Sequence, residues 1–365
     1  MSNDSGQFLA WRLLYVKQLT ILTNRYFNKH PVWHLAYEWE DGFSQTLNIE
    51  IINRKFFAVL VRVTYQIGRL RLPINLSLIY EWIDDLYTRN FNKSIALRID
   101  MYPRTTSYLG LGKKQVIPYI IDFDRNVSLQ DFKKVYEGHK LILISSYNAL
   151  NYLESNRLGL NVKHLPLSLP DKYQLTRETF FGEREFDLIL PGRPNKQILA
   201  WLAKFEQVNP EFEYLSYEHI DNRHVYVSNK GKIVDCRTRD AYFSLLRKCN
   251  IAVYSTQGVD GNAKSFDHIT AKLFEAISSG CLMIGLYPET DESIAFRVAD
   301  ICPSIFSYDD FSDTLLKYVD FKRCEDDLNH YIEFIGANRT SNVAKHLASI
   351  VNSSGFEDLS LLQSE

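Results

Sequence analysis

The sequence predicts an α/β protein with two domains, and three observations lead to this prediction. The chain has 365 residues, which is enough for two domains at roughly 150 residues each. Apolar residues make up 45% and charged residues 24%, a composition that excludes a mostly disordered chain. Along both halves, short apolar runs lead into polar loops and then into helical patterns, which is typical of parallel sheets covered by helices.

The first half is predicted to form three short strands, because three apolar runs each end in polar residues. Asp100 follows the first run, Asp122 and Asp124 follow the second, and Ser145 follows the third. Runs of this kind suit the buried strands of a parallel sheet. The predicted strands are residues 94–99, 116–121 and 140–144, and the predicted helices are residues 56–67, 76–87 and 145–152.

The segment 8–27 is predicted to be an amphipathic helix. Apolar residues such as Phe8 and Trp11 alternate with basic residues such as Arg12 and Lys17. A helix of this kind either packs on its own domain or lies on an anionic membrane surface, and both interpretations stay open. No uncharged apolar run reaches the roughly 18 residues of a spanning helix, and the start of the chain has no secretory signal pattern.

The second half repeats the alternation of strand and helix more clearly. A helix predicted over 270–279 stops at Gly280, which suits the left-handed conformation that follows many helices. Between the halves, Pro166 and Pro170 bracket an extended stretch, which charged residues follow. The predicted strands are 186–190, 212–217, 251–254 and 281–285, with a hairpin over 222–234, and the predicted helices are 197–208, 238–248 and 270–279. The predicted domains are 1–172 and 173–325, followed by C-terminal helices over 326–352 and a flexible tail over 353–365.

Charge and cysteine usage exclude several function classes. The 42 Lys and Arg residues face 44 Asp and Glu residues, so the formal net charge is −2. Proteins that bind nucleic acid phosphates are usually basic, so no nucleic acid partner is expected. The five cysteines are widely spaced and have no zinc-site spacing. Free thiols in a reducing cytoplasm are therefore expected.

The most informative segment is residues 260–285, DGNAKSFDHITAKLFEAISSGCLMIG. A loop leads into a helix there, and backbone N–H groups at a helix start attract anions. A nucleotide diphosphate is a natural ligand for such a site. Lys264, Ser265 and Thr270 are candidate side-chain donors to the phosphates, and Glu275 is a candidate acceptor for ribose hydroxyls.

This segment resembles the donor-binding motif of GT-B glycosyltransferases. In that family an acidic residue stands eight positions before a glutamate, as Asp267 stands before Glu275 here. The resemblance implies that Glu275 binds the nucleotide ribose and that Asp267 approaches the donor sugar. Many members have Glu in place of Asp267, and related bacterial polysaccharide enzymes share a basic residue at the position of Lys272. The implied fold is two Rossmann-like domains that face a cleft, with C-terminal helices that cross back.

Two further stretches fit the same resemblance. The segment LILPGRPNK supplies Gly192, Arg193 and Lys196, where the family places a Gly-Arg pair and a later Lys, at a longer spacing, to bind the diphosphate. The guanidinium of Arg193 suits phosphate because its planar fork matches two oxygens at once. Ser255 and Thr256 end another predicted strand, and ligands of such sheets lie outside the carboxyl ends of the strands.

The implied reaction is sugar transfer without a metal or another cofactor, since positive side chains and helix ends carry the leaving-group charge. Asp122 and Asp124 spell a DxD pair, but they lie in the first half and are interpreted as a polar loop rather than a metal site. An inverting enzyme would need a general base in that half, and Asp122 is the candidate. A retaining enzyme would need none, so the stereochemistry stays open.

The leading hypothesis is a cytoplasmic glycosyltransferase that builds a cell-surface polysaccharide, such as capsule or lipopolysaccharide. Its expected partners are a nucleotide-sugar donor and a glycan or lipid-linked glycan acceptor, with peripheral membrane contact if the segment 8–27 lies on the bilayer. One alternative is a nucleotide-sugar epimerase or glycerophosphate transferase of the same fold. Another is a non-catalytic nucleotide- or glycan-binding module, motivated by Asp267 in place of Glu.

Overall fold

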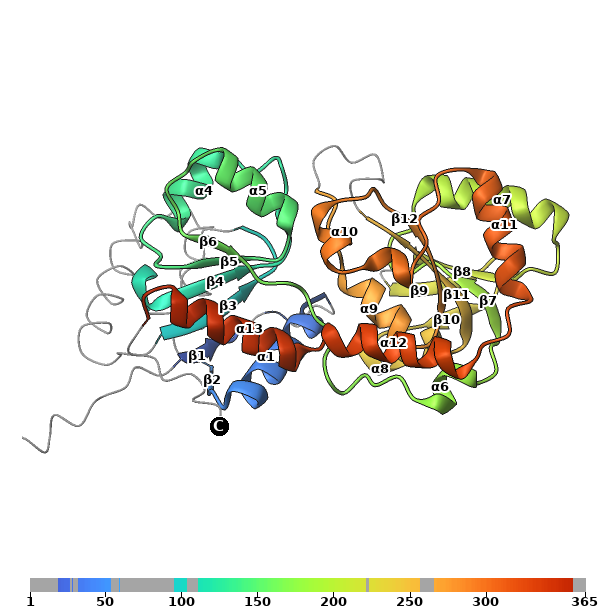
Figure 1. The fold of residues 1–365 in the computed structure, drawn as a ribbon, viewed down its shortest axis with the longest axis horizontal. Coiled ribbons are helices and arrows are strands. Elements are labelled where there is room, and N and C mark those ends of the chain that lie inside the picture. Colours follow the sequence, from blue (N-terminus) through green and yellow to red (C-terminus); the bar gives the residue numbers. More distant parts are fainter. Residues whose placement is uncertain are drawn as a thin grey trace, which may run out of the picture.

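A computed structural model describes residues 19–26, 28, 32–53, 59, 95–103, 111–220, 223–256 and 266–356. Within these residues the chain forms two lobes, each built on a six-stranded sheet (Figure 1). The first sheet is parallel throughout, in the order β2-β1-β3-β4-β5-β6. The second has the order β10-β9-β8-β7-β11-β12 and is parallel except for the pairs of β9 with β8 and β10. The predicted α/β class is confirmed.

The first lobe contains the three strands that the apolar runs predict. They are β3 (Ile95–Asp100), β4 (Val116–Ile120) and β5 (Ile142–Ile144), and every residue of the three is buried. The predicted helices 56–67 and 76–87 fall almost wholly outside the described residues. The other elements of this lobe are β1 (Leu19–Leu22), β2 (Ile51–Ile52), β6 (Val162–His164), α1 (Val32–Leu47), a 3-10 turn (Lys113–Gln115), α4 (Leu129–Tyr136) and α5 (Tyr147–Ser155).

The predicted helix 8–27 is wrong over its described part. Leu19–Leu22 forms the strand β1, with all four residues buried. This strand pairs in parallel with both β2 and β3, so it lies inside the sheet. A four-residue segment is too short for periodicity to separate a strand from a helix, and pairing with residues far along the chain decided its conformation. Residues 8–18 lie outside the described part, so membrane contact through this segment stays a prediction.

The second lobe follows the predicted pattern of strands and helices. The hairpin expected over 222–234 is present as β9 and β10, with Gly231 at φ +84° in its turn. Gly280 ends α9 at φ +73°, the left-handed conformation expected of a glycine there. The strands are β7 (Phe186–Ile189), β8 (Tyr214–Ile220), β9 (Arg223–Ser228), β10 (Ile233–Asp235), β11 (Cys249–Ser255) and β12 (Leu282–Leu286). The helices are α6 (Arg177–Phe181), α7 (Lys196–Val208), α8 (Arg239–Arg247), α9 (Ala271–Ser278), α10 (Asp291–Ala295), the 3-10 turn Val298–Asp300, and α11 (Tyr308–Val319).

The C-terminal helices cross back to the first lobe, as the resemblance implies. Helix α12 (Glu325–Ala337) packs against α9 of the second lobe, and α13 (Thr340–Ser353) packs against α1 of the first (Figure 1). A hydrogen bond of 2.9 Å between the hydroxyls of Ser168 and Thr340 joins the crossing to the segment between the sheets. The domain boundary that we propose, between residues 172 and 173, falls in that same segment.

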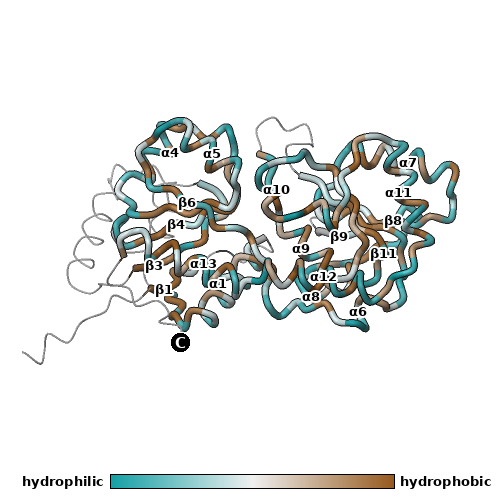
Figure 2. Tube along the Cα trace, in the orientation of Figure 1, coloured by the Kyte–Doolittle hydropathy of each residue, from teal (hydrophilic) through white to brown (hydrophobic). Residues whose placement is uncertain are grey.

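Buried strands form the core of each lobe. In Figure 2 the strands of both sheets are predominantly apolar, and polar segments lie toward the outside. The largest buried cluster runs from β1 and α1 through the segment between the sheets to α9 and α13, so the two lobes share apolar packing. Among the described residues, no helix combines the length and the apolar character that a bilayer-spanning segment needs.

Glu292 is a buried carboxyl group at the contact between the lobes. It is 1% exposed in α10, and it faces the backbone N–H groups of Ile269 in its own lobe and Tyr147 in the other. Burial raises the pKa of Glu292 to about 8, although the two N–H groups lower it.

Replacing Glu292 by Gln is expected to flatten the pH dependence of stability. The usual pKa of the group is 4.5, and its folded value is about 8. Between these values the folded state binds more protons than the unfolded state, so the free energy of unfolding falls as pH rises, by at most about 1.4 kcal/mol per pH unit. Denaturant unfolding at several pH values in this window measures the slope. Glu289→Gln, at an exposed position in the preceding loop, should keep the wild-type slope; equal slopes for all three proteins would contradict the assignment.

Candidate functional site

The candidate site lies where the carboxyl ends of strands from both lobes meet. The loop after β7 carries Gly192 and Arg193, and the segment that leads into α9 carries Asp267 and His268. Across from them, Asp122 follows β4 of the first lobe. The Oδ1 atom of Asp122 is 3.7 Å from Nε2 of His268, which places the two loops in contact. This is the edge at which parallel sheets bind ligands.

Gly192 and Lys272 fit closely against each other. The glycine has φ +70°, and a Cβ atom built on it would lie 2.6 Å from Cε of Lys272. The N–H of Gly192 donates to the hydroxyl of Tyr226 at 2.9 Å, which fixes the loop on the second sheet. A glycine is needed here both for its left-handed backbone and for the space that the lysine side chain occupies. Lys272 therefore lies beside the Gly-Arg loop, although 80 residues of sequence separate them.

Three positive or protonatable groups surround Asp122. Burial raises the pKa of Asp122, and the charges of His268, Arg193 and Lys272 lower it. The effect of burial is larger, so the pKa of Asp122 lies above its usual value. The side chain of Asp122 is 28% exposed and that of His268 is 7% exposed. Arg193 and Lys272, which are predicted to bind the donor, thus lie close enough to Asp122, the predicted base, to affect its pKa.

Asp267 is fixed by contacts from both lobes. Thr256 Oγ1 donates to its Oδ1 at 2.5 Å, and Asn148 of α5 donates to its main-chain carbonyl at 2.5 Å. The phenol of Tyr254 organises the same segment, since it donates to the carbonyl of His268 and accepts from the N–H of Thr270. The structure therefore joins Thr256, Asp267 and Thr270 into one loop framework.

Glu275 lies deeper, on the buried side of α9. Its side chain is 4% exposed, and Oε1 is 2.6 Å from Nη1 of Arg239. Tyr226 connects this pair to the loop after β7, because its hydroxyl accepts from the N–H of Gly192. Tyr226 also lies near Glu275: burial raises the pKa of Tyr226 most, and the charge of Glu275 raises it further. Tyr226 thus lies between Glu275 and Gly192, the residue that precedes Arg193 in the chain.

The remaining predicted residues have weaker structural connections to this group. Ser255 ends β11 and is half-buried. Lys196 is the exposed first residue of α7, whose start is capped by Asn195 through the N–H groups of Gln197 and Ile198. No contact between Lys196 and Asp122, Lys272 or Glu275 is seen among the described residues. Lys264 and Ser265 lie outside the described part of the chain, and their roles stay predictions.

The sequence did not single out His268, Arg239 or Tyr226 for the site. His268 stands next to Asp267, so its position in the motif is the signal that points to it. Arg239 and Tyr226 belong to a different helix and strand and carry no motif. Their positions beside the motif residues follow only from how α8, α9 and β9 pack together, which no local sequence pattern indicates.

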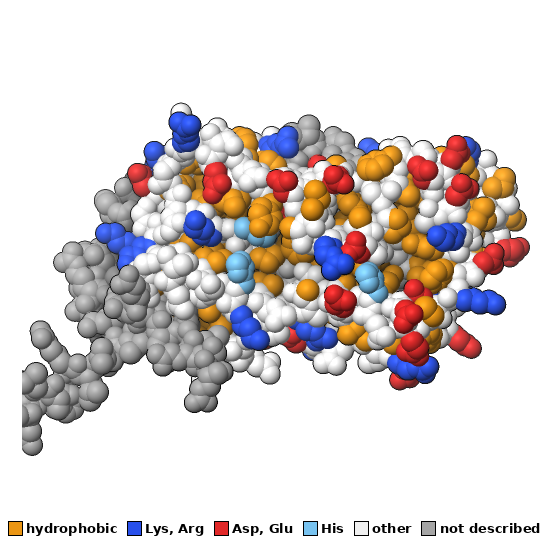
Figure 3. Space-filling model, in the orientation of Figure 1, with side chains coloured by type: hydrophobic (Ala, Val, Ile, Leu, Met, Phe, Trp, Pro, Cys, Tyr) orange, Lys and Arg blue, Asp and Glu red, His pale blue; other side chains and the backbone are white. Residues whose placement is uncertain are grey.

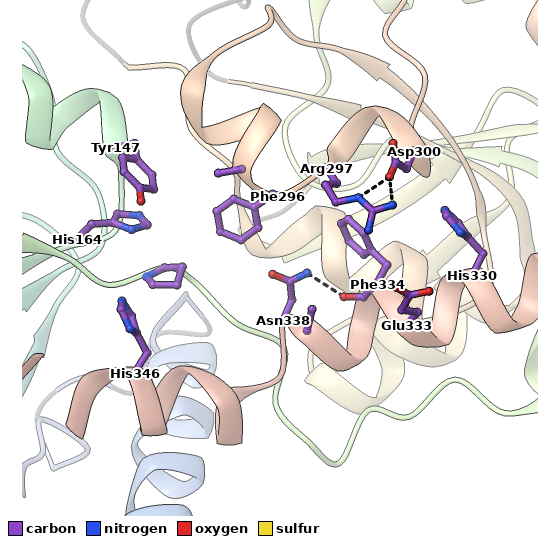
Figure 4. A pocket seen from close by; sticks show the side chains of 13 residues that line it. Tyr147, His164, Phe296, Arg297, Asp300, His330, Glu333, Phe334, Asn338 and His346 are labelled. Atoms are coloured by element: carbon purple, nitrogen blue, oxygen red, sulfur yellow. Dashed lines mark hydrogen bonds and ion pairs between the residues drawn. The ribbon is translucent and has the colours of Figure 1, made fainter. Parts of the chain in front are cut away.

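A separate cavity of about 360 Å³ lies where α5, α10, α12 and α13 meet (Figure 4). The rings of Tyr147 and His164 are in contact at its first-lobe wall, with centroids 4.0 Å apart and planes tilted by 34°. Burial lowers the pKa of His164 to about 4, so this histidine is neutral at physiological pH. Arg297 and Asp300 form an ion pair of 2.6 Å at the opposite wall. Figure 3 shows histidine and apolar side chains across the middle of this face.

The described residues contain no group of three or more His, Cys, Asp or Glu side chains that could hold a metal ion. The described cysteines are free thiols. Within the described part of the chain, Asp122 and Asp124 thus belong to no group of three or more side chains that could hold a metal ion. The side chain of Asp124 accepts a hydrogen bond from the N–H of Asn126 at 2.9 Å, as in a polar turn.

Known proteins resemble this chain in structure and not in sequence. No family model matches it, and no curated protein matches it. It is similar to the pneumococcal O-GlcNAc transferase GtfA in complex with UDP and GlcNAc, at 11% identity and a TM-score of 0.45 over 76% of this chain and 59% of that chain. It is also similar to TarM, at 8% identity and a TM-score of 0.47 over 74% and 57%, and to sucrose-phosphate synthase from Thermosynechococcus elongatus, at 9% identity and 0.38 over 74% and 70%. The chain spans less than two thirds of the length of GtfA and TarM.

Replacing Gly192 by Ala is expected to displace Lys272 and weaken nucleoside diphosphate binding. Gly159→Ala is the matched control, because Gly159 has φ +72° but a Cβ atom added there would meet no atom within 4 Å. Both variants should lose about 1 kcal/mol of stability through the left-handed backbone. Only Gly192→Ala should also lose affinity, which calorimetric titration with nucleoside diphosphates measures. Equal affinities in the two variants would contradict the role of this contact.

Proposed function

We propose that the chain is a GT-B glycosyltransferase that moves a sugar from a nucleotide-diphosphate donor to a hydroxyl of a glycan. The observation that carries the proposal is the convergence of Arg193, Lys272 and Asp122 at the meeting point of the two lobes. Two cations on one lobe and a carboxylate with a raised pKa on the other supply the two functions that glycosyl transfer needs. One stabilises a departing anion, and the other accepts a proton.

Arg193 and Lys272 are proposed to bind the donor diphosphate. The guanidinium fork and the ammonium group offer several N–H donors to phosphate oxygens, and hydrogen bonds to charged acceptors are the strong ones. As the glycosidic bond breaks, negative charge grows on the leaving diphosphate. Cations already held in place stabilise that charge without reorganising at the moment of reaction.

The donor ribose and sugar are proposed to contact the two acidic residues of the motif. Glu275 would accept hydrogen bonds from ribose hydroxyls, and Asp267 would approach the sugar. Asp267 is held from both sides by Thr256 and Asn148, so its position is set before a ligand arrives. Fixed geometry of this kind lowers the entropic cost of orienting a substrate.

Asp122 is proposed to act as the general base. It would take the proton of the acceptor hydroxyl while that oxygen forms a bond to the anomeric carbon. The bond from this carbon to the phosphate oxygen breaks at the same time, and its electron pair leaves with the diphosphate. Burial raises the pKa of Asp122, which makes it a stronger base than an ordinary carboxylate. Transfer by this route inverts the anomeric centre.

The proposed acceptor, location and metal independence rest on the sequence motifs and not on the geometry of the site. A cell-surface polysaccharide or lipid-linked glycan as acceptor, a cytoplasmic location and a metal-independent reaction are proposed on the resemblance of the motifs. An epimerase, a glycerophosphate transferase or a non-catalytic binding module of the same fold would share the donor site. They differ in the product that a donor panel yields, since only a glycosyltransferase releases nucleoside diphosphate in step with a new glycosidic bond.

Removing either cation is expected to weaken binding of nucleoside diphosphates. Arg193→Ala and Lys272→Ala should each raise the Kd by about tenfold or more, because a charge-assisted hydrogen bond contributes about 1.5–3 kcal/mol. Arg177→Ala removes the same charge from α6, where Arg177 forms an exposed ion pair with Glu325 of α12, and it should leave the Kd unchanged. Calorimetric titration with UDP, GDP, ADP, CDP and dTDP gives the values. Wild-type affinity in both site variants would refute the donor site.

Replacing Asp122 by Asn should lower the rate of transfer and spare donor binding. A lost general base costs about 100- to 10,000-fold in kcat, whereas removing a negative charge near the phosphates should not weaken the donor. Asp124→Asn, two residues further along the same loop, is the matched control and should retain wild-type kcat. In the wild type, the rate should fall on the acid side with an apparent pKa above the usual value of 3.8. A wild-type rate in Asp122→Asn would contradict the role of Asp122 as the base and the proposal that transfer inverts the anomeric centre.

A further inference from the structure

We propose that Arg239 is a positioning residue that couples donor binding to the contact between the lobes, through Glu275 on one side and Glu38 on the other. The inference rests on the proposed function, because it takes Glu275 as the ribose-binding carboxylate. It assigns a role to three residues that the donor motif does not contain: Glu38, Arg239 and Tyr173.

Arg239 makes ion pairs with carboxylates from both lobes. Its Nη1 is 2.6 Å from Oε1 of Glu275 in α9, and its Nε is 3.2 Å from Oε2 of Glu38 in α1 of the first lobe. The three side chains are 17%, 4% and 11% exposed, in the order Arg239, Glu275 and Glu38. Ion pairs with so little exposure are screened weakly by salt and depend strongly on geometry.

Aromatic side chains hold the guanidinium in this position. Its central carbon lies 5.1 Å from the ring centroid of Phe243 and 5.6 Å from that of Tyr173. The two rings are themselves stacked, with centroids 3.6 Å apart and planes 9° from parallel. Phe243 belongs to α8, whereas Tyr173 belongs to the segment between the two sheets. The arginine therefore lies against an aromatic stack that includes the connection between the lobes.

Glu38 extends the contact to the same connection. The hydroxyl of Tyr173 donates to its Oε1 at 2.5 Å, and Nζ of Lys172 is 2.8 Å from the same oxygen. One oxygen of Glu38 thus binds the connecting segment and the other binds Arg239. A shift of the first lobe relative to the second changes the Glu38–Arg239 distance before it changes any contact within the second lobe.

This geometry links the state of Glu275 to the placement of the first lobe. With Glu38 in place, the positive charge of Arg239 is shared between two carboxylates. Without Glu38, that charge acts on Glu275 alone, which makes the carboxylate a weaker hydrogen-bond acceptor for ribose hydroxyls. Donor affinity should therefore depend on a residue of the opposite lobe, and the coupling is reciprocal by linkage.

The test is the affinity of nucleoside diphosphates for the full chain carrying Glu38→Gln, with UDP, GDP, ADP, CDP and dTDP as probes in calorimetric titration. Glu38→Gln keeps the shape of the side chain and removes its charge, and it should raise the Kd by about five- to twentyfold, a typical coupling. Asp41→Asn is the matched control on the same helix, at a 60% exposed side chain paired with Arg25, and it should keep the wild-type Kd. Arg239→Lys should weaken binding, since a lysine cannot pair with both carboxylates through one planar fork.

A purely structural role would lower the unfolding midpoint of Glu38→Gln and leave the Kd of the folded fraction unchanged, which would overturn the inference. If Glu38→Gln does not fold, Tyr173→Phe decides: it removes one hydrogen bond to Glu38 and keeps the aromatic stack, and a wild-type Kd would overturn the inference equally.

The coupling and the donor site can be disproved separately. Binding by the wild type with no change in these variants removes the coupling alone, whereas a wild type that binds none of the probes removes the donor site and the coupling with it.

Discussion

The approach of Asp122 to the positive loops of the second lobe is the contact on which the rest of the site depends. Like charges within one lobe would repel each other, and Arg193 and Lys272 lie close together around Gly192. A carboxylate supplied by the other lobe reduces that repulsion in the absence of a ligand. The proposed diphosphate ligand would compensate these charges more strongly, because it carries more negative charge and more acceptor oxygens than a single carboxylate.

Much of the fold was predictable because most of its strands have a clear local pattern. The buried runs at β3, β4, β5, β7, β11 and β12 are short, apolar and followed by polar loops, and this pattern is typical of parallel strands covered on both faces. The strand β1 was not predicted, because its four residues are too few to show a strand pattern and its conformation depends on pairing with β2 and β3. Helix α1 and strand β6 have no motif and were not predicted. Tertiary pairing, and not local preference, determines such elements.

Candidate site residues could be named from the sequence where they stand in a motif, but not where only packing brings them together. Gly192, Arg193, Asp267, Lys272 and Glu275 stand in two short stretches, and the resemblance of these stretches to a known donor-binding motif made them candidates. The surroundings of Glu275 could not be foreseen, because Arg239 approaches it from another helix and Glu38 from another lobe. The consequence is chemical as well as structural: the carboxylate of Glu275 is part of a buried charged network with Arg239 and Glu38. Buried networks of this kind depend on every member, since an unpaired buried charge is costly.

The return of α13 to the first lobe has a mechanical consequence. The chain passes between the lobes twice, and the two passages are tied together: the N–H of Leu169 donates to the carbonyl of Asn338 at 2.9 Å, and the N–H of Thr340 donates to the carbonyl of Leu169 at 2.9 Å. These hydrogen bonds hold the two stretches of backbone side by side, so a rotation of one lobe against the other would have to bend both stretches at the same place.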